Sequence, residues 1–226
     1  MSITETLVDG LETEGILQRV RDGRADLVVM ATHGRGPLGR FFLGSVADVL
    51  VRETSVPVLL VRPHGAGPDS GAAAEDVLVP LDGPPLAEQI LGPAADLARL
   101  TGATVTLLRV VLPPPAYGMD LPPYAAAGAA DLALLEDLRH EAEAYLTRVA
   151  LCPQPVGHAV ETRVVAHAHA ATGLLEEAAR TGCDLIALET HGRRGLPRLF
   201  LGSVADKVVR GAEVPVLLYR SLTGAP

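Results

Sequence analysis

A possible phosphate-binding loop is the part of this sequence whose residue types and spacing most clearly suggest chemistry. Gly192 and Arg193 follow an apolar run at 185–188, and Gly202-Ser203 precedes a helical apolar stripe. Backbone N–H groups at a helix start attract anions, and glycine leaves room for a ligand to approach. The same residues also fit an ordinary helix capped by Ser203, so this loop alone leaves both interpretations open.

An internal repeat strengthens the interpretation of this loop as a phosphate-binding site. Motifs that begin at His33 and Gly44 recur 158 residues later, at His191 and Gly202, and the register holds without a gap over residues 4–62. A repeat of this length indicates a duplicated structural unit rather than a chance match.

The elements that must position these motifs alternate between strands and helices. Short apolar runs are separated by stretches of helical period, which predicts a parallel sheet with helices on both faces. Gly92-Pro93 interrupts one helical stretch and predicts a kink or break there. The expected strands are 4–8, 27–30, 56–61, 77–81, 104–111, 160–166, 185–188 and 214–219, and the expected helices include 86–97, 132–149 and 172–179.

Composition excludes several classes of protein. The chain has 226 residues, 48% of them hydrophobic, a formal net charge of −8 and a pI near 5.3. This balance argues against a general nucleic-acid or anionic-membrane surface. Its two cysteines cannot form a disulfide framework, and no apolar run is long enough to span a membrane. We expect a cytoplasmic protein, with no nucleic-acid or membrane partner.

The combined pattern resembles the universal stress protein family. It consists of H-G-R, then L-G-S-V-A-D, then V-P-V-L-L at 214–218. Nucleotide-binding members of this family carry G-x2-G-x9-G-[ST]. Gly192, Gly202 and Ser203 occupy the last three positions of that pattern, whereas Glu189 stands where the family has its first glycine.

The resemblance implies an α/β fold with an open parallel five-stranded sheet, in strand order 3-2-1-4-5, for residues 76–226. Residues 1–62 match the C-terminal half of the same domain, and 63–75 have the composition of a flexible linker. The half-copy would lack strands 1 and 2, which leaves the strand at 27–30 with an open edge.

The resemblance also implies that the complete unit binds ATP or another adenine nucleotide, with or without Mg²⁺, in a regulatory or stress-response role. We expect no catalytic residues and no metal site, although weak ATP hydrolysis stays open. Two alternatives are a ligand-free dimerisation module of the family and a slow nucleotide hydrolase or transferase. The expected ligand-binding residues are Asp82, Val110, Glu189, His191, Gly192, Arg193, Gly202, Ser203 and Val204.

Glu189 has two opposed interpretations. Its carboxylate can accept hydrogen bonds from a ribose, or it can repel phosphate unless Arg193 or Arg194 neutralises it. The residues alone do not decide between these roles.

The final strands of the two units are near-copies. Residues 56–61 and 214–219 both begin with Val-Pro-Val, and family members commonly dimerise through this strand. We therefore expect either a homodimer or a pseudo-dimer within one chain, because pairing covers the open edges.

Overall fold

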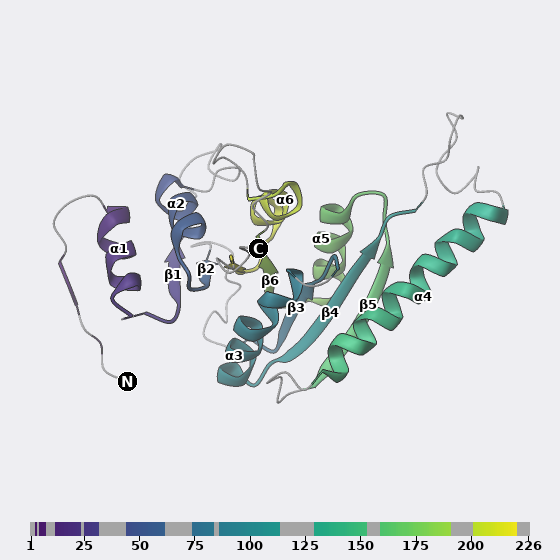
Figure 1. The fold of residues 1–226 in the computed structure, drawn as a ribbon, viewed down its shortest axis with the longest axis horizontal. Coiled ribbons are helices and arrows are strands. Elements are labelled where there is room, and N and C mark those ends of the chain that lie inside the picture. Colours follow the sequence, from purple (N-terminus) through teal and green to yellow (C-terminus); the bar gives the residue numbers. More distant parts are fainter. Residues whose placement is uncertain are drawn as a thin grey trace.

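The computed structural model describes residues 3, 5–7, 12–23, 25–31, 44–61, 74–83, 86–113, 129–152, 159–190 and 201–220. Their strands form one seven-stranded sheet in the order β1-β2-β7-β6-β3-β4-β5 (Figure 1). Every neighbouring pair of strands is parallel except β2 and β7, which are antiparallel. The predicted α/β class is therefore confirmed, and the sheet is mixed. The strands are β1 Val28–Ala31, β2 Val58–Val61, β3 Asp76–Pro80, β4 Thr104–Val111, β5 Val160–Ala166, β6 Leu185–Glu189 and β7 Val216–Tyr219.

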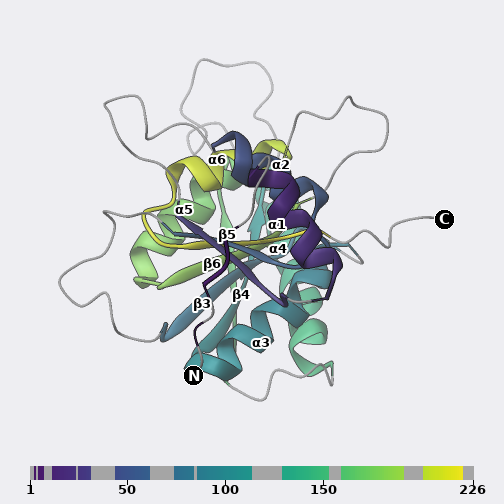
Figure 2. The same ribbon diagram turned by 90° about the vertical axis from the view of Figure 1, so that its left-hand side faces the viewer.

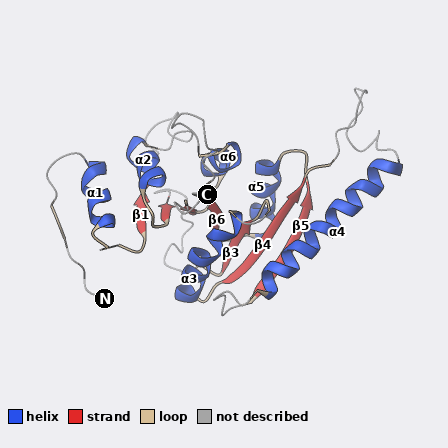
Figure 3. Ribbon diagram, in the orientation of Figure 1, coloured by secondary structure: helices blue, strands red, loops and turns tan. Residues whose placement is uncertain are grey.

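Helices cover both faces of this sheet (Figure 3). In Figure 2, which looks along the sheet from the β1 end, α2, α5 and α6 lie above the strands and α3 lies below them. The helix α1 packs beside α2. The helices are α1 Glu12–Arg21, α2 Ser45–Glu53, the short 3₁₀ helix η2 Ala87–Ile90, α3 Leu91–Thr101, α4 Ala129–Leu151, α5 Ala170–Thr181 and α6 Ser203–Gly211.

One apolar core lies between the sheet and α2, α5 and α6. Leu78 and Ile186 on the strands pack with Leu174 of α5 and Val208 of α6, and all four side chains are buried. The central strands are apolar on both faces because both faces are covered, as is usual for parallel sheets.

A second core lies on the opposite face, between the sheet and η2, α3 and α4. Val79 and Leu185 pack there with Ile90, Ala94 and Leu146. Burying an aliphatic side chain of this size stabilises a fold by about 2 kcal/mol, so these two cores hold the strands in place.

The final strands of the two units meet at the antiparallel junction. Val58 is opposite Leu218, and Leu60 is opposite Val216. The structure thus pairs the two strands that the sequence analysis expected to meet. Since β7 also pairs with β6, and β2 with β1, neither strand leaves an open edge at the junction.

The arginine after β7 adds a polar contact across this junction. The Nη1 atom of Arg220 donates a hydrogen bond to the backbone carbonyl of Arg52, 2.6 Å away, in the last turn of α2. A cation near a helix C-terminus is favourable because the carbonyl groups there carry a partial negative charge.

The expected strand at 4–8 was wrong for the residues that the structure describes. Glu5, Thr6 and Leu7 have no regular secondary structure, and Leu7 is exposed. Residues 162–166, which match 4–8 in the internal repeat, lie in β5, which pairs with β4 along its length. The described residues before α1 include no strand that could pair with residues 5–7 in this way.

The helical segment around Gly92-Pro93 changes its type of helix but is not broken. The chain changes from the 3₁₀ helix to the α-helix between Ile90 and Leu91. Pro93 then falls in the first turn of α3, where a backbone N–H would have no partner within the helix.

Candidate functional site

The carboxyl ends of three neighbouring strands place the first group of expected ligand-binding residues. Asp82 follows β3, Val110 is the last residue but one of β4, and Glu189 ends β6. Because β3 lies between β4 and β6 and all three are parallel, these residues lie at the same edge of the sheet. The chain reverses its direction of winding at β3, and ligands of open α/β sheets bind at such switch points.

The N-terminus of α6 contributes the second group, and here one expectation was wrong. The N-cap is Gly202 rather than Ser203, and this residue makes no side-chain capping hydrogen bond. The Gly202 carbonyl accepts the first helical hydrogen bond, from the Asp206 N–H at 2.9 Å, so Ser203 and Val204 are already helical. A helix start without a side-chain cap leaves its N–H groups to water or to a ligand.

The backbone of Gly202 explains why glycine stands at this position. Its φ of 88° and ψ of 143° lie in a region that residues with a Cβ atom avoid. This conformation directs the preceding loop into the helix start without placing a side chain there.

Asp206, in the first turn of α6, pairs with another residue of the same helix. Asp206 forms a two-pronged ion pair with Arg210, with distances of 2.8 Å and 2.9 Å between nitrogen and oxygen atoms. The Asp206 carboxylate therefore binds Arg210, one turn later in α6, and not the N–H groups at the start of the helix.

Glu189 lies at the junction between the strand and the loop that follows. It pairs in register with Tyr219 of β7, and its Oε2 atom is buried. The next residue, Thr190, is also buried, and its N–H donates to the Tyr219 carbonyl at 2.9 Å. The start of the loop is therefore fixed to the sheet. His191, Gly192 and Arg193 lie outside the described residues, so their predicted roles stay predictions.

Sequence reasoning missed Arg109. It is the charged residue of β4, whose sequence is TVTLLRVV, and its Nη1 donates to the Leu81 carbonyl at 3.1 Å. A single arginine in an otherwise uncharged strand was a signal that could have been noticed. Its contact lies one residue before Asp82, at the edge of the sheet that carries the candidate site.

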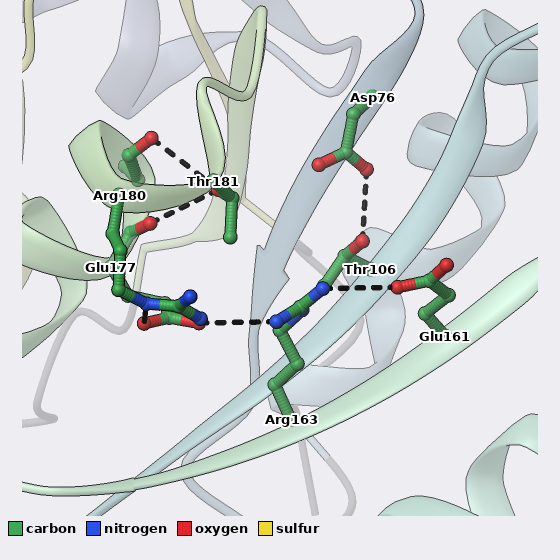
Figure 4. A network of polar contacts seen from close by, with 8 residues as sticks. Asp76, Thr106, Glu161, Arg163, Glu177, Arg180 and Thr181 are labelled. Carbon is green, nitrogen blue, oxygen red and sulfur yellow. Dashed lines mark hydrogen bonds and ion pairs between the residues drawn. The ribbon is translucent and has the colours of Figure 1, made fainter.

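The amino ends of the strands carry a different polar network (Figure 4). Arg163 of β5 lies between Glu161 and the buried Glu177 of α5, at 3.2 Å and 3.8 Å. Arg180 also binds Glu177, and this hydrogen bond lowers the pKa of the Glu177 carboxyl. At the same end, the hydroxyl of Thr106 donates to Asp76 at 2.8 Å. Most of these groups pair with one another, although the buried Nε atom of Arg163 has no hydrogen-bond partner among the described residues. This pairing indicates a structural role away from the ligand edge.

Other chemistry finds little support among the described residues. Cys183 is buried, and burial raises the pKa of its thiol to about 12, so it remains a neutral thiol near pH 7. No group of three or more potential metal ligands occurs in the described part of the chain. No described helix is long and apolar enough to cross a membrane.

Comparison with known families identifies the type of protein. The family model described as the universal stress protein family matches residues 2–62 and 74–220, which is most of the chain. This chain belongs to the universal stress protein family.

Curated relatives and solved structures agree with this assignment. A universal stress protein of Mycobacterium tuberculosis is 33% identical over 208 residues, which cover 87% of this chain and 62% of that protein. One of Mycolicibacterium smegmatis is 30% identical and covers 97% of this chain and 66% of its own length. This universal stress protein thus spans less than two thirds of the length of these curated relatives.

The solved structures support the fold. A functionally unknown protein from Pseudomonas aeruginosa PAO1 has a TM-score of 0.68 at 15% identity, covering 95% of this chain and 69% of that chain. A universal stress protein from Archaeoglobus fulgidus has a TM-score of 0.61 at 18% identity, covering 92% and 66%. At this level of identity the likeness concerns the fold and not the ligand.

Proposed function

We propose that this universal stress protein binds one adenine nucleotide, such as ATP, in a regulatory or stress-response role. The observation that carries the proposal is the meeting of three strand ends and an uncapped helix start in one unit. Asp82 and Val110, at the carboxyl ends of β3 and β4, would face the base and ribose, and the N-terminus of α6 would offer its N–H groups to phosphate. Gly192 and Arg193 would complete the phosphate loop.

The proposal includes the division of the chain into two units. Residues 76–226 form the complete unit, with the strand order 3-2-1-4-5, and residues 1–62 form a C-terminal half-copy joined to it by a linker at 63–75. The antiparallel pairing of β2 with β7 supports an internal pseudo-dimer, because it joins equivalent strands of the two units. The half-copy keeps a helix start at Gly44 but has no equivalent of Asp82 or Val110.

Calorimetric titration with ATP tests the proposal. We expect one site per chain, weakened by Asp82→Asn and removed by blocking the start of α6. Binding of two nucleotides per chain would contradict the assignment of the site to the complete unit. Absence of binding, with and without Mg²⁺, would favour the alternative of a ligand-free interaction module.

Glu189→Gly decides between the two roles of Glu189. The variant restores the glycine that nucleotide-binding family members carry and removes a carboxylate close to the expected phosphate. We expect equal or tighter ATP binding. A loss of about tenfold, near 1.4 kcal/mol, would instead make Glu189 a direct ligand contact.

A further inference from the structure

The strands β3 and β4 separate earlier than their ladder requires. The Leu81 N–H donates to the Leu108 carbonyl at 2.8 Å, and the register between the strands ends at Pro80 and Leu108. In a parallel ladder, alternate residues direct their backbone groups to the same neighbour. The next bond would therefore join the Val110 N–H to the Leu81 carbonyl. That bond is absent among the described residues, although β4 continues to residue 111.

Arg109 occupies the acceptor that this bond would use. Its Nη1 lies 3.1 Å from the Leu81 carbonyl oxygen, and its guanidinium carbon lies 5.8 Å from the centre of the Tyr145 ring. Tyr145 is buried on α4, so the aromatic ring provides a fixed surface for the cation. A carbonyl that the backbone could have paired by itself is paired by a half-buried charged side chain instead.

The consequence concerns the backbone of Val110. The Val111 carbonyl accepts from the His167 N–H at 3.0 Å, which directs the backbone groups of Val111 toward β5. Those of Val110 therefore face the opposite side, where β3 has already ended. One N–H and one C=O stand there next to each other, at the edge that carries Asp82.

We propose that Arg109 is a positioning residue, which keeps the Val110 backbone open to a ligand by occupying the Leu81 carbonyl. The proposal rests on the proposed nucleotide site, in which Val110 is an expected ligand residue, and adds the side chain on which the base preference of that backbone depends. An adjacent donor and acceptor match the Watson–Crick edge of adenine, which offers an acceptor nitrogen beside an amino group. Guanine presents the reverse pattern, an N–H beside a carbonyl oxygen, so a guanine held in the orientation of adenine would set its N–H against the Val110 N–H and its oxygen against the Val110 carbonyl.

Amide hydrogen exchange in the nucleotide-free protein tests the first step. In the unaltered protein we expect the Val110 amide to exchange quickly for a residue in a central strand. In Arg109→Met the Leu81 carbonyl loses its side-chain donor, so Val110 should bond to it and its exchange should slow by about tenfold. The control is Arg148→Met, which removes the guanidinium 5.5 Å from the same Tyr145 ring and should leave Val110 unchanged. Equal exchange in the unaltered protein and in Arg109→Met would overturn the proposal.

The preference for ATP over GTP tests the second step. Arg109→Met should bring the two affinities to within about threefold of each other, whereas Arg109→Lys, which retains a donor, should keep most of the preference. A variant that only loosened the fold would weaken both nucleotides equally and leave their ratio unchanged, which would also overturn the proposal. If Arg109→Met does not fold, Arg109→Gln removes the reach to Leu81 and serves the same two measurements.

The two measurements distinguish a failure of the proposed nucleotide function from a failure of the proposed role of Arg109. If the unaltered protein binds neither nucleotide, the proposed function fails, while the exchange of Val110 still decides whether Arg109 holds the strands apart. If ATP binds but its preference over GTP survives in Arg109→Met, the function stands and the role of Arg109 is wrong.

Discussion

Val29 and Ala187 occupy equivalent positions of the internal repeat, yet the side chain of Val29 is 59% exposed and that of Ala187 is 0% exposed. Both lie in the strand that precedes the glycine-bounded loop. At Ala187, η2, α3 and α4 cover this face of the sheet, and β3 pairs with the edge of β6. Among the described residues, β1 lies at the edge of the sheet and has no strand on its outer side. The environment of each strand therefore depends on its neighbours as much as on its own sequence.

The starts of α2 and α6 also differ, in the backbone conformation of their N-cap residues. Gly44 and Gly202 are equivalent N-caps, and both accept a helical hydrogen bond at 2.9 Å. Their φ values are −58° and 88°, so only Gly202 uses a conformation that needs glycine. The same motif thus supports an ordinary helix start in one unit and the candidate anion site in the other.

The largest expected difference between the units follows from these glycines. Gly202→Val should reduce ATP affinity by about a hundredfold, because a branched side chain cannot adopt this conformation and would enter the phosphate space. Gly44→Val should leave affinity unchanged, since a Cβ atom there meets nothing within 4 Å and φ is ordinary. Calorimetry, with circular dichroism to check folding, measures both. Equal losses of ATP affinity in the two variants would show that the two helix starts do not differ in their role.

A second matched pair compares the packing of the final strands. Leu217 is 1% exposed, whereas its equivalent Leu59 is only partly buried. We expect Leu217→Ala to lower the free energy of unfolding by about 3 kcal/mol and Leu59→Ala by about 1 kcal/mol, because only the first leaves a closed cavity. Urea denaturation measures both values. Similar losses would show that the outer face of the half-copy is covered in solution.

The acid sensitivity of the complete unit should depend on Glu177. Arg180 holds the pKa of this carboxyl below its ordinary value of 4.5. The ion pair therefore stabilises the fold above pH 4.5, and this stability is lost as the pH falls through the lowered pKa. In the first copy of the internal repeat, Arg19 and Asp22 stand at the positions of Glu177 and Arg180, so the charges are reversed there.

Glu177→Gln should cost about 2 kcal/mol at pH 7 and less at pH 3, because it removes a buried charge whose partners remain. The control is Glu176→Gln, which alters a neighbouring carboxylate that is 67% exposed. Urea denaturation at both pH values measures the difference. If Glu177→Gln costs the same at pH 3 as at pH 7, the ion pair does not account for the loss.

The sequence predicted the parts of the fold that depend on local pattern. Apolar runs placed β4 and β5 at their observed bounds, and the likeness of residues 56–61 to 214–219 indicated which strands would meet. The strand at 4–8 failed, because an isolated extended segment needs a partner that the repeat does not supply. A local pattern cannot show whether such a partner is present.

The candidate site was predictable to a similar degree. The glycine pattern led to Gly202, but the N-cap was assigned one residue too late, since propensity favours serine and the backbone angle of a glycine cannot be inferred from its neighbours. Arg109 was missed because its role depends on where two strands separate, which is a property of the ladder and not of the strand's own sequence.

The smallest expected effect concerns the junction that joins the two units. Arg220→Ala removes the hydrogen bond to the Arg52 carbonyl and should lower the free energy of unfolding by about 1 kcal/mol. Since the core of the complete unit does not depend on this bond, the change should appear mainly as faster amide exchange in β1 and β2, with β6 unaffected. Arg52→Ala is the control: it keeps the backbone carbonyl that Arg220 binds and removes only the ion pair with Asp48, which is a helix pair worth about 0.4 kcal/mol. If exchange in β6 rises as much as in β1 and β2, the two units unfold together, and the comparison between them describes packing but not independent stability.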